Sequence, residues 1–297
     1  MGGTQKKKPY IMMISSLLIV GTIGLFRRYI PLSSPLLAFC RGMIGSLSLL
    51  AWAALVKKER WRRIPGKTLA LMVLNGAFLG VNWILLFEAF NYTTIAKATL
   101  AYYMQPTILL LLSPLLFREK LTGRKLLCAA AALAGMVLVS GALESAGAAA
   151  DDRLGILFGL AAACFYALVV VLNKKIDRVD AYPKTIIQLF SSAAVLVPYL
   201  LLKNEFAGAA LGGRVLALVL LVGVVHTGFV YALFFGSMND LKAQTISTLG
   251  YIDPVTAMLV SGLVLREKLS ALNLIGAVLI IGSALVSELA SGKRADR

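Results

Sequence analysis

Residues 96–121 read AKATLAYYMQPTILLLLSPLLFREKL, and residues 244–269 read QTISTLGYIDPVTAMLVSGLVLREKL. The two stretches align without a gap and are identical at 9 of 26 positions, including Tyr103 with Tyr251 and Pro106 with Pro254. The offset is 148 residues in a chain of 297. A self-similarity at this spacing indicates an internal duplication. The sequence therefore predicts two copies of one unit, residues 1–148 and residues 149–297.

The composition indicates that both units lie in a membrane. Hydrophobic residues make up 59% of the chain, charged residues 15%, and the mean hydropathy is +0.83. A water-soluble domain of this size has too little interior to bury that much apolar surface. The net charge of +16 would favour a nucleic-acid partner in a soluble protein. Here the basic residues fall in short loops, which is typical of membrane orientation, so we expect a lipid bilayer and no nucleic acid.

Ten apolar runs are long enough to cross a bilayer, which takes roughly 20 residues of helix. They are 9–30, 34–56, 68–90, 93–117, 124–143, 153–173, 184–202, 214–238, 244–265 and 270–290. The first five and the last five correspond under the offset of 148, and the Ala/Gly-rich piece 145–150 joins them. The predicted fold class is an all-α integral membrane protein of ten transmembrane helices.

Counting Lys and Arg orients the chain. With the N-terminus in the cytoplasm, the cytoplasmic segments carry 21 basic residues and the outer segments 7. This ratio favours two cytoplasmic termini. Because five is odd, the two halves then lie in opposite orientations, as two inverted five-helix repeats. Such repeats are the architecture of alternating access in secondary transporters.

Asp253 is the strongest candidate for a functional residue. It lies about 13 Å into the ninth run, close to the membrane midplane, and its repeat counterpart is Gln105. Each precedes a proline, Pro106 or Pro254, which cannot donate a backbone hydrogen bond and so breaks the helix. Broken helices at corresponding positions of two halves favour a transporter site, and a midplane acid is usually functional. The plainer alternative is a proline kink in which Asp253, neutral or paired, only helps to hold neighbouring helices together.

Three other charged residues and one histidine stand out within the apolar runs. Glu88 and Lys97 flank the turn between the third and fourth runs at similar depth, where they are able to pair directly, and Arg41 lies at a similar depth. They form either a structural ion cluster or the outer part of a substrate path. His226 lies mid-run, and we favour an interhelical hydrogen bond over a proton relay.

Aromatic and small residues complete the pattern. Tyr102, Tyr103, Tyr251 and Trp83, which is next to Asn82, are candidate walls of a cavity, although most membrane aromatics only pack or anchor. Gly76 with Gly80, and Gly155 with Gly159, have GxxxG spacing. This spacing predicts close helix packing within the chain, or a weak homodimer as the alternative to a monomer.

Several chemistries lack their usual residues in this sequence. There is no Walker motif for ATP, and one histidine without a CxxC pair argues against a metal site. A single His also leaves no Ser/His/acid set. We expect no cofactor, no metal and no enzymatic activity.

The ten runs in two halves, each with a proline followed by Arg-Glu-Lys-Leu, resemble the EamA-type members of the drug/metabolite transporter superfamily. Arg41 and the stretch Phe87-Glu88-Ala89-Phe90-Asn91-Tyr92-Thr93-Thr94 also resemble that family's pattern. The resemblance covers nearly the whole chain. It implies a secondary transporter of the bacterial inner membrane, often an exporter of amino acids or related metabolites, with a central cavity between the halves. Glu88 departs from the family pattern, in which a neutral residue is usual.

The leading hypothesis is a secondary transporter of a small polar metabolite such as an amino acid, working as an exporter, with a coupling proton as an additional partner. Arg41, Lys97, Glu88 and Asp253 together offer both signs of charge to a zwitterion. A carrier of a quaternary amine or another organic cation is the alternative. A lipid flippase or intramembrane enzyme, and a passive channel, are the other classes considered.

Overall fold

The computed structural model describes residues 2–55, 64–93, 95–139, 152–176, 179–207, 212–264, 266 and 270–295. Every regular element within these residues is a helix, so the predicted all-α class is confirmed for them. The helices of the first half are α1 (Gly2–Gly21), α2 (Ile23–Arg27), α3 (Ser34–Leu55), α4 (Gly66–Tyr92), α5 (Ile95–Tyr102), α6 (Gln105–Phe117) and α7 (Gly123–Val139). Those of the second half are α8 (Asp152–Lys175), α9 (Ala181–Leu202), α10 (Gly213–Leu221), η1 (Val222–Phe229), α11 (Val230–Ser237), η2 (Met238–Asp240), α12 (Ala243–Leu249), α13 (Ile252–Val264) and α14 (Ala271–Ala295).

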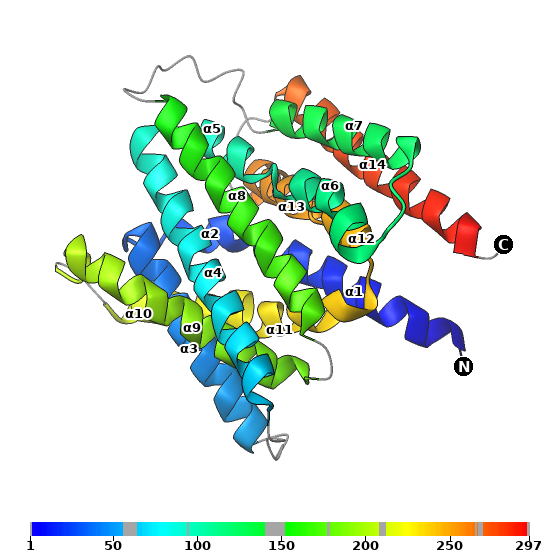
Figure 1. Ribbon diagram of the computed structural model, residues 1–297. Helices are drawn as coiled ribbons and strands as arrows, with labels where there is room; N and C mark the ends of the chain where they lie inside the picture. Colours follow the sequence, from blue (N-terminus) through cyan, green and yellow to red (C-terminus); the bar gives the residue numbers. More distant parts are fainter. Residues whose placement is uncertain are drawn as a thin grey trace.

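Within the described residues, eight helical segments are long and apolar enough to cross a membrane. They are Lys7–Arg27, Ser34–Leu55, Gly66–Tyr92, Lys97–Phe117, Arg153–Lys175, Ala181–Leu202, Gly213–Asp240 and Ala243–Val264. Each coincides with one of the ten predicted runs. The remaining two runs fall on α7 and on α14, whose apolar part is Ala271–Ser287. These two helices lie side by side at the edge of the molecule (Figure 1).

The two predicted helix breaks are present. The fourth segment turns at residues 103–104 between α5 and α6, and the ninth turns at 250–251 between α12 and α13. Pro106 then lies in the first turn of α6, where its missing N–H removes no helical bond. The prolines therefore do what the sequence predicted.

Both GxxxG pairs bring helices of this one chain together. A Cβ on Gly80 would lie 2.7 Å from the carbonyl oxygen of Ser192, so α4 and α9 approach backbone to backbone. A Cβ on Gly155 would lie 2.5 Å from the Thr93 side chain, so the start of α8 packs against the end of α4. The prediction of packing within the chain is confirmed for both pairs.

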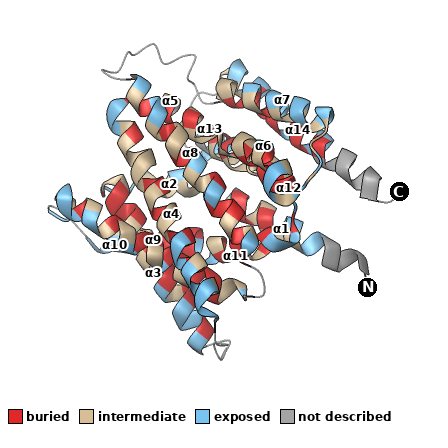
Figure 2. Cartoon of the chain, in the orientation of Figure 1, coloured by how far each residue is buried: buried red, intermediate tan, exposed pale blue. Residues whose placement is uncertain are grey.

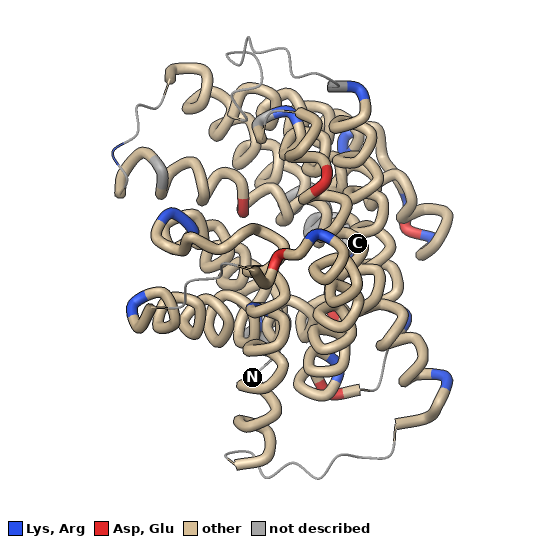
Figure 3. Tube along the Cα trace, turned by 90° about the vertical axis from the view of Figure 1, so that its left-hand side faces the viewer, with Lys and Arg blue, Asp and Glu red and all other residues tan. Residues whose placement is uncertain are grey.

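Buried residues follow the inner faces of the helices, and the outward faces remain apolar and exposed (Figure 2). Leu55, Leu115, Leu202, Leu263 and Val278 are each more than two-thirds exposed. An apolar surface of this extent is what a lipid environment requires. Lys, Arg, Asp and Glu positions gather near helix ends and loops, and most of the helical trace is free of them (Figure 3).

One segment departs from the expected α-helix. The predicted run 214–238 contains a π-helix, η1, between α10 and α11. Thr227 Oγ1 donates to the carbonyl oxygen of Val222, five residues earlier, at 3.2 Å. The segment packs closely on α3, because a Cβ on Gly45 would lie 3.0 Å from the nitrogen of Gly228. The pattern of apolar residues did not predict the π-helix, because π-turns are short local interruptions of an α-helix. They often lie at functional positions.

Candidate functional site

A cavity of about 110 Å³ lies where the two broken helices meet. This volume is enough for several water molecules or a small solute, at roughly 10–15 Å³ per water in this measure. Residues from both halves line it: Ser16, Leu17, Val20, Tyr102, Gln105, Pro106, Leu109, Tyr166, Ala167, Val170, Val230, Tyr231, Phe234, Ile246, Ser247, Gly250 and Asp253. On α8, the lining residues begin 11 residues after Gly155 and end 4 residues before Lys174, so the cavity lies well inside the helix bundle.

Asp253 and Gln105 both line the cavity, as their repeat positions predicted. Asp253 lies in the first turn of α13, where the helix dipole favours a negative charge. The Tyr103 hydroxyl donates a long hydrogen bond of 3.5 Å to Asp253 Oδ2. Gln105 Oε1 is buried and has no hydrogen-bond partner among the residues that the structure describes. A buried polar atom without a partner is costly, so it marks a place where water or a solute group is needed.

Four aromatic rings form much of the cavity wall. Tyr102 was expected there, and Tyr166, Tyr231 and Phe234 join it. The ring centroids of Tyr102 and Tyr166 lie 6.1 Å apart, and those of Tyr166 and Phe234 lie 6.5 Å apart. Hydroxyl groups and ring faces therefore border the same small space.

Three expected wall residues are not in this lining: Tyr103 bonds Asp253, and Tyr251 and Trp83 have other neighbours. Tyr251 is 3% exposed and shares a hydrogen bond of 2.7 Å with Thr107 Oγ1, in a second apolar cluster that includes Met136 and Val255. Trp83 packs under Arg41 and does not line this cavity. The expectation that Tyr251 and Trp83 form walls of this cavity is corrected, because their rings pack against other neighbours, Thr107 for Tyr251 and Arg41 for Trp83.

Arg41 lies beside the cavity, held by two contacts. Its guanidinium carbon is 5.6 Å from the centre of the Trp83 ring, and its Nε donates to Thr227 Oγ1 at 3.2 Å. It interacts electrostatically with Tyr231 and Tyr102, two of the lining residues. The charge of Arg41 therefore lies close enough to act on the cavity, although Arg41 is not part of the cavity wall.

Asn82 lies in the same layer as Arg41. Its Nδ2 donates to the carbonyl oxygen of Ala162 at 2.6 Å, one turn of α8 before Tyr166. Thr227, the partner of Arg41, similarly lies four residues before Tyr231. Arg41, Asn82 and Trp83 therefore form a polar layer about one helical turn from the cavity.

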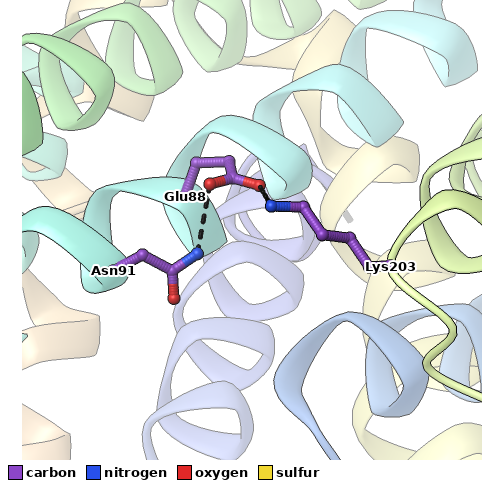
Figure 4. A network of polar contacts seen from close by, with 3 residues as sticks. All are labelled: Glu88, Asn91 and Lys203. Atoms are coloured by element: carbon purple, nitrogen blue, oxygen red, sulfur yellow. Dashed lines mark hydrogen bonds and ion pairs between the residues drawn. The ribbon is translucent and has the colours of Figure 1, made fainter.

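Glu88 has a partner that the sequence did not suggest. Its carboxylate pairs with Lys203 Nζ at 3.0 Å and accepts a hydrogen bond from Asn91 Nδ2 at 3.1 Å (Figure 4). Lys203 follows α9, and the neighbouring carboxylate raises its pKa. The observed partner of Glu88 is thus Lys203 from the second half, where the sequence suggested Lys97, which lies at the start of α5. Glu88 and Arg41 have different partners, so the expected single cluster is corrected.

His226 makes the interhelical contact that was expected of it. Its Nε2 lies 2.9 Å from Thr22 Oγ1, between α1 and α2, and its ring meets Phe26 edge to face at 4.8 Å. Its Nδ1 is buried and finds no hydrogen-bond partner in the described part of the chain. It does not line the cavity.

The sequence alone did not place Ser16, Tyr166, Tyr231 and Ser247 in the site. A serine or tyrosine in the middle of an apolar run was the available signal, but many such residues bond only to their own helix. Ser16, for example, donates to the carbonyl oxygen of Met13. Which of them face the cavity depends on helix rotation and on contacts between distant parts of the chain.

This fold is that of a polytopic α-helical membrane protein with a polar cavity between two broken helices. The sequence model of the EamA-like transporter family matches twice, over residues 7–141 and 153–288. The chain belongs to the EamA-like transporter family.

Named relatives agree with this assignment. An uncharacterized transporter, YxxF, of Bacillus subtilis (strain 168) is 32% identical over 97% of this chain and 92% of its own length. The protein PecM of Dickeya dadantii (strain 3937) is 27% identical over 73% of this chain and 72% of its own. The protein RarD of Salmonella typhi is 29% identical over 70% of each. One protein of known crystal structure superposes with a TM-score of 0.81 at 23% identity, over 95% of this chain and 98% of its own, which shows a shared fold.

Proposed function

We propose that this transporter is a secondary carrier that exports a small polar metabolite such as an amino acid by alternating access. The observation that carries the proposal is the cavity at the junction of the two broken helices, with Asp253 from one half and Gln105 from the other. Broken helices at corresponding positions leave backbone N–H and C=O groups free at membrane depth. In an unbroken helix these backbone groups are all used in hydrogen bonds within the helix. Asp253 binds either the substrate amine or a coupling proton.

The proposed membrane arrangement is ten spans in two inverted repeats of five, residues 1–148 and 149–297. Two features support it: the family model matches the halves separately, and α7 and α14 add two apolar helices to the eight long ones. With both termini in the cytoplasm, the chain is a multi-pass protein of the bacterial inner membrane. It acts as a monomer or a weak homodimer. Cysteine labelling that placed residues 118–120 and 266 on one common face would contradict the inversion.

An amino acid suits the charges near the cavity. Asp253 offers a carboxylate to the ammonium group, and Arg41, which interacts with Tyr102 and Tyr231, offers a cation to the carboxylate. Glu88 is neutralised by Lys203 and has no part in this recognition. Lys97, which the sequence also placed on the substrate path, remains a proposed component of that path. The two opposite charges match a zwitterion without leaving a large net charge in lipid.

An organic cation is the second candidate, and one observation favours it. The lining contains one carboxylate and four aromatic rings but no Lys or Arg among the described residues. Aromatic faces with a carboxylate form a suitable site for a quaternary or protonated amine.

Transport into proteoliposomes tests the proposal. The purified protein is reconstituted, and uptake of radiolabelled amino acids and of choline-like amines is measured with and without an imposed proton gradient. Saturable uptake that a proton gradient drives against the solute gradient supports a coupled carrier. Ionic currents much larger than carrier turnover would instead identify a channel.

A further inference from the structure

A group of polar contacts joins the two halves at one end of the cavity. The carboxylate of Glu119, in the loop after α6, accepts hydrogen bonds from the backbone nitrogens of Ala243 and Gln244 at 2.8 and 3.1 Å. It therefore holds the first turn of α12, which belongs to the other half. A carboxylate on the free N–H groups of a helix start is a charge-assisted contact, stronger than a neutral hydrogen bond.

The side chain of Gln244 strengthens this junction. Its Nε2 donates to Ser113 Oγ at 2.9 Å and to the carbonyl oxygen of Lys120 at 3.4 Å, and its Oε1 accepts from Lys125. Gln244 is only 2% exposed. The end of α6 and the start of α12 are thus tied through buried side chains as well as through Glu119.

Lys174, at the end of α8, adds a third helix to this junction. Its Nζ donates to the carbonyl oxygens of Met238, at 3.2 Å, and of Leu241, and lies 5.4 Å from the centre of the Phe117 ring. It also interacts electrostatically with Glu119. Its charge therefore bridges the residues just before α12 and the end of α6.

These contacts lie directly over the cavity. On three helices, a lining residue is followed one turn further out by a residue of this junction. The pairs are Leu109 and Ser113 on α6, Val170 and Lys174 on α8, and Ser247 and Ala243 on α12. One turn is about 5.4 Å, so a solute leaving the cavity in this direction meets the junction at once.

We propose that Glu119, Gln244 and Lys174 form the gate that closes this end of the cavity, and that Glu119 is the contact whose release opens it. The inference rests on the proposed function, because a gate has meaning only if the cavity opens alternately to two sides. Glu119 touches no substrate and acts by positioning α12. Its release exposes two backbone N–H groups and a carboxylate, all of which water at the membrane surface readily solvates.

Site-directed labelling tests the gate without any knowledge of the substrate. In a variant without Cys40, Cys128 and Cys164, a reporter cysteine replaces Val170 in the cavity lining. A membrane-impermeant thiol reagent is applied to vesicles of either orientation. A second reporter, Lys120→Cys, is exposed and identifies the face that carries the gate.

Glu119→Gln is expected to raise the labelling rate of the cavity reporter about tenfold from the gate face and to lower it from the opposite face. A tenfold shift corresponds to about 1.4 kcal/mol. Glu119→Asp keeps the charge and should lie between the wild type and Glu119→Gln. The matched control is Glu88→Gln, which removes another carboxylate that bridges the halves. Glu88 is near the end of α4 that packs on the start of α8, whereas Lys174 is at the end of α8, so this control should leave gate-face labelling unchanged.

Unchanged labelling in Glu119→Gln would overturn the gate. So would an equal increase from both faces, because it would indicate general loosening. Transport is measured separately in proteoliposomes. If no solute is transported while the one-sided labelling shift holds, the proposed function fails and the gate stands. Transport with no labelling shift supports the proposed function and rejects the gate.

Discussion

The two broken helices, α5–α6 and α12–α13, share a backbone plan but carry different chemistry. Both turn just before a proline, and both present the residue before that proline to the cavity. In the first half this residue is the amide of Gln105, and in the second it is the carboxylate of Asp253. The duplication supplies the shape of the site, and substitutions between the copies supply its charge.

The tyrosines at the two breaks also occupy equivalent positions but make different contacts. Tyr103 and Tyr251 are repeat counterparts, and each reaches across to the other half. Tyr103 donates to Asp253 beside the cavity at 3.5 Å, whereas Tyr251 pairs with the neutral Thr107 at 2.7 Å in a packed region. The first contact is a functional one in our proposal, and the second holds the halves together.

The largest expected effect comes from removing the charge that distinguishes the two breaks. Asp253→Asn should lower the initial transport rate by about 10- to 100-fold, because hydrogen bonds to charged groups contribute roughly 1.5–3 kcal/mol. Gln105→Ala, which removes a neutral group, should lower it by about 3- to 10-fold. Rates are measured in proteoliposomes at matched protein amounts. Equal losses in the two variants would remove the proposed asymmetry.

Substitution of Arg41 tests which class of substrate the cavity binds. Arg41→Gln should raise the half-saturation concentration for an amino acid by about tenfold, because a buried cation beside the cavity attracts the substrate carboxylate through a medium of low dielectric. The same variant should leave an amine that lacks a carboxylate nearly unaffected. Competition uptake with matched pairs of solutes measures both values. Equal weakening of both solutes would show that Arg41 acts only on the structure.

The smallest expected effect concerns the structural tyrosine. Tyr251→Phe and Thr107→Val each remove one partner of a single hydrogen bond between the halves. Their coupling in a double-mutant cycle should be about 0.6 kcal/mol, typical of such bonds in membrane proteins. Reversible unfolding in mixed detergent micelles measures it. Tyr103→Phe with Thr107→Val is the matched control pair, and it should show additive effects.

The sequence predicted the helix breaks and the placement of Asp253 and Gln105 because these depend on local signals. A proline breaks its own helix wherever that helix packs. Residues that precede the two prolines in a duplicated unit must lie at equivalent places. The positions of Pro106 and Pro254 were therefore enough to predict the central part of the site.

The rest depended on helix rotation and long-range contacts, for which the sequence holds no comparable signal. Tyr102 ends α5 and Tyr103 begins the turn, so their side chains point in different directions, and Tyr102 lines the cavity while Tyr103 bonds Asp253 at its edge. The pairing of Lys203 with Glu88 likewise follows from the way α9 packs on α4. The Glu119 contact joins residues 124 positions apart and needed the structure to be seen.

The π-helix η1 has a consequence for how the chain tolerates length changes. Its wide turns hold one residue more than an α-helix would over the same rise. Deleting a single residue between Val222 and Phe229 would let the segment relax to ordinary helix, with α10 and α11 keeping nearly their present alignment. The wide turn itself would be lost, and with it the contact of Thr227 with the carbonyl oxygen of Val222, five residues earlier. The surplus residue therefore gives the span a place where a one-residue deletion is absorbed locally, next to the Thr227 hydroxyl that accepts from Arg41.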